Sequence, residues 1–239
     1  MSGPFDILHI DDHLVVIDKP EGFHVHRPEL KGVKVDDDVV VLQRLRDQLG
    51  RWVYPVHRLD APTSGCLVLA FSGEVASQLS KGFGSEDFQK TYTGVVRGWT
   101  AEQLEIELPL ESPEDKAKLL PSLSRLRRLA TTEFEESVGK RHATARFSLV
   151  ELEPVTGRFH QLRRHLNRVA HPLVGDVMHG DRYQNHFFAQ RLGIEGLCLR
   201  ASALSFLHPE SGQRIEIKAP ITDKWRRIRN VFDSPSHAR

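Results

Sequence analysis

The chain has 239 residues, of which 39% are hydrophobic and 27% charged, the composition of an ordinary globular protein. No stretch approaches the length and apolarity of a membrane span, and Met1 to Pro4 lack the basic region and apolar core of a signal peptide. Cys66 and Cys198 lie in apolar stretches that suit buried thiols in a reducing compartment. We therefore expect a cytoplasmic protein without a membrane partner or a disulfide.

The net charge is only +1, but the basic residues are clustered. Residues 156–168 contain four arginines and no acid, whereas acids gather at residues 36–38 and 133–136. One such cluster is usually a solvated face, but two of them favour a polyanionic partner. The clusters are Arg158, Arg163, Arg164 and Arg168, and then Lys224, Arg226, Arg227 and Arg229.

The first third of the chain begins with short apolar runs. Two runs within residues 7–19 predict a hairpin, and a polar loop over residues 24–34 follows it. The spacing of apolar residues then predicts a helix over residues 39–49, with Asp37 or Asp38 as its cap.

The middle of the chain centres on an apolar run at residues 66–70, which predicts a buried strand. Ser72 caps a predicted short helix that ends at Gly82, and residues 91–96 form another predicted strand. Prolines interrupt residues 111–141, so we expect a long irregular excursion there, either a lobe that faces the polyanionic partner or a mobile loop.

The last third returns to regular patterns. We expect strands at residues 143–153, 197–207 and 214–219, a helix at residues 160–169, and a final helix capped by Thr222. Strands interleaved with short helices and hairpins favour an α+β fold over a doubly wound sheet.

The loop before the buried strand carries the most informative residues. Pro62 prevents regular backbone hydrogen bonding there, and Gly65 allows a conformation that other residues resist. Asp60 lies two residues after Arg58, so the loop presents a carboxylate beside a guanidinium. Taken alone, this pair is either a reactive group or an exposed ion pair of little consequence.

The loop also resembles a known signature. Residues 57–65 read HRLDAPTSG and are similar to the HRLD-x-x-TSG signature of the RluA family of pseudouridine synthases. Further family motifs follow in the expected order, and together they span about residues 5–220. They are Lys19-Pro20-x-Gly22, Lys90-x-Tyr92, Thr156-Gly157-Arg158-x-His160-Gln161-Leu162-Arg163 and His171-Pro172-x-x-Gly175-Asp176.

The resemblance implies an enzyme that isomerises uridine in RNA to pseudouridine. It implies an α+β pseudouridine synthase fold, with a mixed, mainly antiparallel central sheet, flanking helices and a central catalytic cleft. We expect a single catalytic domain over residues 1–239, made of two sub-lobes and lacking the S4-like RNA-binding domain of some relatives. The reaction moves the base from N1 to C5 and consumes nothing, so we expect no metal and no cofactor.

The motifs also assign roles to single residues. Asp60 matches the family's nucleophilic aspartate, and Arg163 matches the basic residue that pairs with it and keeps it ionised. Tyr92 corresponds to the tyrosine that stacks on the flipped base, and Arg58 resembles the residue that fills the gap left in the RNA. The residues expected to contact RNA are Arg58, His57, Arg158, Arg164 and Arg168.

Other motif residues have structural roles in this interpretation. We expect His57, His160 and Asp176 to hold loops by hydrogen bonds. Two positions depart from the family pattern: Ala61 replaces a basic residue, and Arg200 stands where a histidine is usual.

Within the family, the sequence is most similar to members that modify tRNA near the junction of the T-stem and the acceptor stem. This similarity implies tRNA as the partner of a protein that we expect to be a monomer. A ribosomal RNA substrate is the alternative within the family. An RNA-binding protein without catalysis is the alternative outside it.

A second constellation suggests a metal-dependent hydrolase. Histidines and aspartates gather within residues 160–181, as a divalent metal site would require. However, His160 and His165 are five residues apart and fall on different faces of the predicted helix. The members are His160, His165, His171, Asp176, His179 and Asp181.

Overall fold

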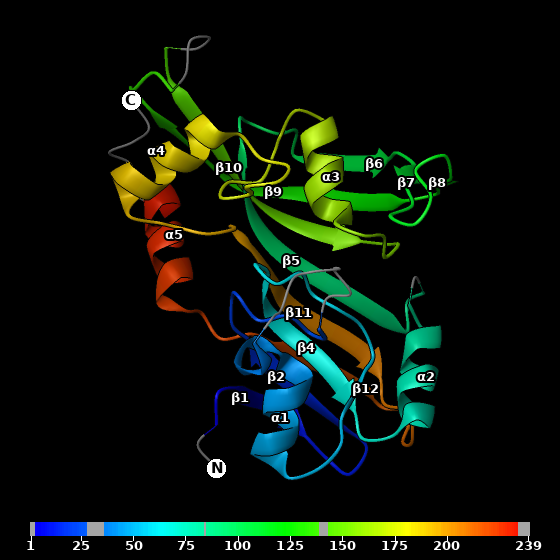
Figure 1. The fold of residues 1–239 in the computed structure, drawn as a ribbon. Coiled ribbons are helices and arrows are strands. Elements are labelled where there is room, and N and C mark those ends of the chain that lie inside the picture. Colours follow the sequence, from blue (N-terminus) through cyan, green and yellow to red (C-terminus); the bar gives the residue numbers. More distant parts are fainter. Residues whose placement is uncertain (1–2, 28–35, 84, 139–142, 234–239) are drawn as a thin grey trace. The chain divides into compact units, whose positions relative to one another are not determined.

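The computed structural model describes residues 3–27, 36–83, 85–138 and 143–233 (Figure 1). The chain divides into two compact units, each with its own strands, helices and apolar core. The first unit contains residues 1–90 and 200–220, and the second contains residues 91–199 and 221–239. Most of the predicted loop at residues 24–34 lies outside the described residues.

The first unit is built on strands in the order β1-β2-β4-β11, with β3 paired to β4 and β12 to β11. The pairs β1–β2, β2–β4 and β11–β12 are antiparallel, whereas β4 and β11 are parallel. The predicted hairpin and buried strand are therefore confirmed. The strands are β1 (Asp6–Ile10), β2 (Leu14–Lys19), β3 (Tyr54–Pro55), β4 (Ser64–Ala70), β11 (Leu199–Leu207) and β12 (Arg214–Lys218).

The start of the first helix differs from the prediction. A 3₁₀ turn, η1 (Asp37–Val39), comes first, and α1 (Val41–Leu49) begins after it. Asp36 caps the 3₁₀ turn by accepting from the N–H of Asp38 at 3.2 Å, so the predicted caps Asp37 and Asp38 are wrong. Val40 is extended, as β-branched residues prefer, and this delays the helix.

The second helix of this unit follows the prediction closely. Helix α2 (Gly73–Lys81) begins at Ser72, whose hydroxyl accepts from the N–H of Val75. Alternate residues of β2 and β4, together with α2, β11 and β12, form one apolar cluster. Its fully buried members include Leu14, Val16, Cys66, Val68 and Phe206.

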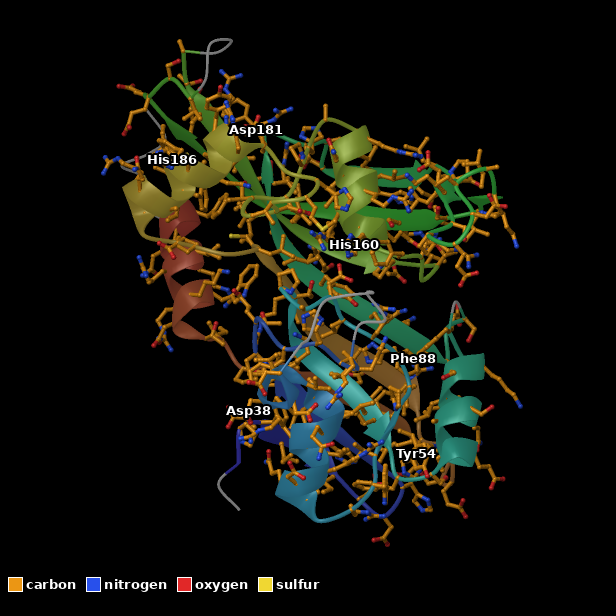
Figure 2. The ribbon with its side chains drawn as sticks, in the orientation of Figure 1. Asp38, Tyr54, Phe88, His160, Asp181 and His186 are labelled. Atoms are coloured by element: carbon orange, nitrogen blue, oxygen red, sulfur yellow. The ribbon has the colours of Figure 1, made fainter. Side chains whose placement is uncertain are left out.

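The second unit has the strand order β5-β10-β9-β6, and the pairs β5–β10, β10–β9 and β9–β6 are antiparallel. Strand β5 begins in the first unit at Phe88, labelled in Figure 2, and continues into the second. Two short strands form a separate pair, β7 with β8. The bounds are β5 (Phe88–Arg97), β6 (Gln103–Glu107), β7 (Leu110–Glu111), β8 (Leu119–Leu120), β9 (Leu123–Phe134) and β10 (Ala145–Pro154).

The predicted irregular excursion over residues 111–141 is wrong for much of its length, because β9 runs from Leu123 to Phe134. Ser124 and Leu126 are buried while Arg125 and Arg127 are exposed, which is the alternation of a strand with one wet face. The exposed arginines of this strand form cross-strand ion pairs. Arg127, for example, meets Glu151 of β10 at 2.8 Å.

Three helices complete the second unit: α3 (Gln161–Arg168), α4 (Arg182–Leu192) and α5 (Asp223–Asp233). Helix α4 was not predicted, although Asp181 caps it (Figure 2) and Gly193 ends it. Helices α4 and α5 lie together in Figure 1, and Phe188 and Trp225 share one apolar cluster. The α+β class is thus confirmed. None of the described helices has the length and apolarity needed to cross a membrane.

Candidate active site

The Asp60 loop lies in the first unit, between β3 and β4. The N–H of Thr63 donates to the carbonyl of Asp60 at 2.9 Å and closes a tight turn, while Leu59 is buried beneath it. Asp60 itself is half-buried. Gly65 has a φ of 112°, and a Cβ there would lie 2.1 Å from the carbonyl oxygen of Ala201. Only glycine therefore allows the loop to enter the sheet this close to β11.

Lys19 is the residue that ties this loop to β2. Its side chain is completely buried, and its Nζ donates to the carbonyls of Pro20, Phe23 and Ala61 at 2.8, 2.9 and 3.1 Å. Burial lowers the pKa of Lys19 to about 7, against the raising effect of Asp60 and two other acids. The sequence motif contains Lys19, but its spacing alone gave no sign that the ammonium binds the residue after Asp60.

His57 is held by the protein's own backbone. Its Nε2 accepts from the N–H of Val68 in β4 at 3.2 Å, and its ring lies against the edges of Phe83 and Phe88. Burial, with the charge of Lys90, lowers the pKa of His57 to about 3, so the ring is neutral at pH 7. This geometry fits the expected structural role.

Arg58 and Tyr92 occupy contrasting environments. Arg58, in the first unit, is exposed. Tyr92 lies on β5 in the second unit, opposite Leu152 of β10, and only 8% of its surface is exposed. The strand predicted to present Tyr92 is therefore present.

Arg163 forms a buried, two-pronged ion pair in the second unit. Its Nε donates to Oδ2 of Asp176 at 2.7 Å and its Nη2 to Oδ1 at 2.8 Å. The N–H groups of Met178 and His179 also donate to Oδ1. Burial acts to raise the pKa of Asp176, but these hydrogen bonds outweigh it and leave the pKa below its ordinary value. Asp176 thus holds the loop after it, as expected.

The arginines expected to contact RNA also bind the protein. Around α3, polar side chains donate to backbone carbonyls of residues 108–123. Arg158, Arg164 and Arg168 donate to the carbonyls of Pro121, Glu111 and Pro109, at 3.1, 3.0 and 2.7 Å. Gln161 donates to the carbonyl of Leu123, and His165 meets that of Leu108 at 2.9 Å. The basic cluster therefore anchors this segment.

The histidines of the metal-hydrolase alternative take part in separate hydrogen bonds. His160 has a φ of 50° at the start of α3 (Figure 2), and its Nδ1 lies 3.0 Å from Nε2 of His179. His165 and His171 each bind a backbone carbonyl, of Leu108 and Arg97. Within the described ranges, no group of three or more His, Cys, Asp or Glu side chains is arranged to hold a metal ion.

Comparison with known proteins identifies the family. Residues 13–168 match the family model described as RNA pseudouridylate synthase, which is more than half of the chain. The chain therefore belongs to the RNA pseudouridylate synthase family, and the resemblance drawn from its motifs is confirmed.

Among its relatives are proteins named tRNA pseudouridine synthase C. The one from Vibrio cholerae is 39% identical over 236 residues, which cover 95% of each chain. The one from Yersinia pestis is 42% identical over 237 residues, covering 95% of this chain and 90% of the relative.

The fold is shared with solved structures. Human RNA pseudouridylate synthase domain containing 1 matches with a TM-score of 0.70 at 21% identity, over 93% of this chain and 86% of that one. Human RNA pseudouridylate synthase domain containing 4 matches with a TM-score of 0.69 at 23% identity, over 94% and 92%. The predicted pseudouridine synthase fold is confirmed.

Proposed function

We propose that this protein isomerises a uridine of tRNA to pseudouridine, near the junction of the T-stem and the acceptor stem. Relatives 39 and 42% identical over almost the whole chain are named for tRNA pseudouridine synthesis. A ribosomal RNA substrate is the alternative within the family.

Asp60 is the proposed nucleophile. The observation that carries this assignment is the geometry of the loop. Asp60 is half-buried on a closed turn, and the carbonyl of the next residue, Ala61, accepts from the Lys19 ammonium. A carboxylate fixed in this way can add to the sugar or the base, or remove a sugar proton, while the bond between N1 and C1′ breaks. The base then turns and rejoins through C5, and the proton of C5 is lost as N1 gains one.

The second unit supplies two further proposed groups. Tyr92 is proposed to stack on the flipped uracil, and its place on a central strand, rather than on a loop, supports a fixed ring. Arg163 is proposed as the basic partner of Asp60. Asp60 belongs to the first unit and Arg163 to the second, so the pairing of Asp60 with Arg163 stays a prediction.

RNA binding is assigned to Arg58, His57, Arg158, Arg164 and Arg168. Arg58 is proposed to occupy the gap left by the flipped base, and its exposure suits that role. The arginines around α3 combine an anchoring hydrogen bond with an accessible charge, since Arg158 and Arg168 are exposed. His57 is proposed to act indirectly: its ring accepts from the N–H of Val68 and so holds the start of the loop that carries Arg58.

The two units are proposed to act as one catalytic domain, in the cytoplasm and as a monomer. The isomerisation consumes no reagent, so the proposed reaction needs neither a metal nor a cofactor.

The test is incubation of the protein with unmodified tRNA, followed by mapping of any new pseudouridine. Asp60→Asn is expected to abolish turnover and leave RNA affinity within a few-fold, because the amide keeps the shape but lacks the nucleophile. Asp12→Asn, which changes an exposed carboxylate of the same unit, is the matched control and should retain activity.

Three outcomes would contradict this assignment. Full activity of Asp60→Asn would remove Asp60 from the reaction. Modification of ribosomal RNA fragments alone would replace tRNA as substrate. Binding of RNA without any turnover would leave a catalytically silent RNA-binding protein.

A further inference from the structure

Arg200, where this sequence departs from the family's usual histidine, lies in the interior of the first unit. Its side chain is 5% exposed, and Nη2 donates to Oδ2 of Asp18 at 2.7 Å and to the carbonyl of Pro220 at 2.9 Å. A guanidinium buried in this way offers no surface to a phosphate. The departure therefore concerns the framework of the unit rather than its contacts with RNA.

The strand register places the Arg200–Asp18 pair next to the Asp60 loop. Arg200 of β11 lies opposite Ser64, the first residue of β4, and Asp18 of β2 lies opposite Cys66. The ion pair thus connects β2 and β11 across the strand that lies between them. This crossing occurs where the loop enters the sheet, beside the close approach of Gly65 to Ala201.

Asp18 is followed directly by the residue that holds the loop. Lys19 donates to the carbonyl of Ala61, and that same carbonyl accepts from the N–H of Gly22 at 2.8 Å. The end of β2 therefore carries both the partner of Arg200 and the ammonium bound beside Asp60. A shift of this strand end moves both.

Asp18 depends heavily on Arg200 for compensation of its charge. Its other carboxylate oxygen, Oδ1, is buried and has no hydrogen-bond partner among the described residues. Burial raises the pKa of Asp18, and Arg200 opposes this rise. Without the guanidinium, Asp18 either takes up a proton or moves toward water, and both changes disturb the adjacent Lys19.

We propose that Arg200 is a positioning residue for Asp60, acting through Asp18 and Lys19 on the loop that presents the carboxylate. The proposal rests on the proposed function. Arginine suits the position because one terminal nitrogen reaches both the carboxylate and the Pro220 carbonyl. The shorter ring of a histidine cannot extend as far from the same backbone position.

The kinetic test compares Arg200→Met with Arg200→Lys, which restores a charge that can reach Asp18. At saturating tRNA, Arg200→Met is expected to lower kcat about tenfold or more, with KM and RNA affinity nearly unchanged, because displaced reacting groups lose rate. Arg200→Lys should recover part of the loss. Arg214→Met is the control: Arg214 also donates to a backbone carbonyl, that of Glu86, but it is exposed.

A second readout does not need activity. Hydrogen exchange at the amides of Gly22 and Thr63 reports the two hydrogen bonds that close the loop. Exchange there should accelerate in Arg200→Met and stay unchanged in Arg214→Met. If wild type is inactive on tRNA yet this pattern appears, the proposed function fails and the bracing of the loop stands.

If Arg200→Met does not fold, Asp18→Asn/Arg200→Met replaces it, because removing both charges avoids a lone buried carboxylate. That variant should fold and still show the low kcat. The proposal is overturned if either folded variant keeps wild-type kcat and wild-type exchange at Gly22 and Thr63, whatever happens to its melting temperature.

Discussion

Each unit of the protein contains a buried arginine–aspartate pair, and the two pairs differ in how completely the aspartate is satisfied. In the second unit, both oxygens of Asp176 accept hydrogen bonds, from Arg163 and from two backbone N–H groups. In the first unit, Arg200 binds one oxygen of Asp18 and the other has no partner among the described residues.

The difference appears in the acidity of the two carboxyls. Both are buried, and burial alone raises the pKa of each. The pKa of Asp176 nevertheless lies below its ordinary value, whereas that of Asp18 lies above it. The number of donors around the carboxylate, rather than the presence of an arginine, therefore sets the direction in which the pKa of each buried aspartate moves.

The largest expected effect is that of Asp176→Asn. The amide nitrogen of asparagine is a donor, and it would face other donors at either position. At Oδ2 it would face Arg163, and at Oδ1 it would face Arg163 and the N–H groups of Met178 and His179. We expect a loss of about 3 to 5 kcal/mol in the free energy of unfolding, the usual cost of breaking a buried pair. Urea denaturation measures it, and a loss below that of Asp18→Asn would contradict the comparison.

Asp18→Asn is expected to cost less, about 1 to 2 kcal/mol. The amide oxygen can still accept from Arg200, and the amide nitrogen can take the place of Oδ1, where no donor opposes it. The same denaturation series serves for both variants. Equal losses would show that hydrogen-bond saturation does not separate the two pairs.

Lys19, a further buried charge, sharpens the comparison because its hydrogen-bond acceptors are carbonyls rather than a carboxylate. Its pKa of about 7 lies below the 10.5 of an unfolded lysine, so the unfolded state binds more protons between these values. Its contribution to stability is therefore complete above pH 10.5 and is lost as the pH falls through about 7.

Nitrogen NMR of the lysine side chains should show one ammonium that titrates near pH 7. Lys19→Met should remove that signal and flatten the rise of stability between pH 7 and 10.5. A Lys19 resonance that titrates near 10.5 would show that the three carbonyls fully compensate the burial of the charge.

Local signals in the sequence predicted the elements that depend on local chemistry. The Ser72 cap and the Gly82 end of α2 and the apolar run of β4 each depend on residues close together in the sequence, and the structure contains all three. Helix α4 was missed because apolar and polar residues are mixed around it, although Asp181 and Gly193 mark its ends.

Contacts between distant segments were not predictable in the same way. The family motif named Arg163, but its pairing with Asp176 depends on a loop geometry that spacing does not encode. In the sequence, Arg200 is only a departure from the family pattern. The strand register places it beside Asp18, which lies 182 residues earlier in the chain. The hydrogen bonds from the basic cluster to the backbone of residues 108–123 could not be predicted either, because the charge of the arginines indicated only a solvated or RNA-facing surface.

That anchoring has a consequence for how this protein can change. Arg158, Arg164 and Arg168 bind backbone oxygens, and a peptide oxygen is present whichever amino acid occupies the position. Residues 113–118 are exposed, so their side chains can vary in evolution or be replaced by a grafted epitope, except that of Asp115, whose Oδ1 accepts from the N–H of Ala117. The arginines that hold the flanking backbone cannot vary in this way. Mutational tolerance should be high on the exposed turn and low on the helix beneath it.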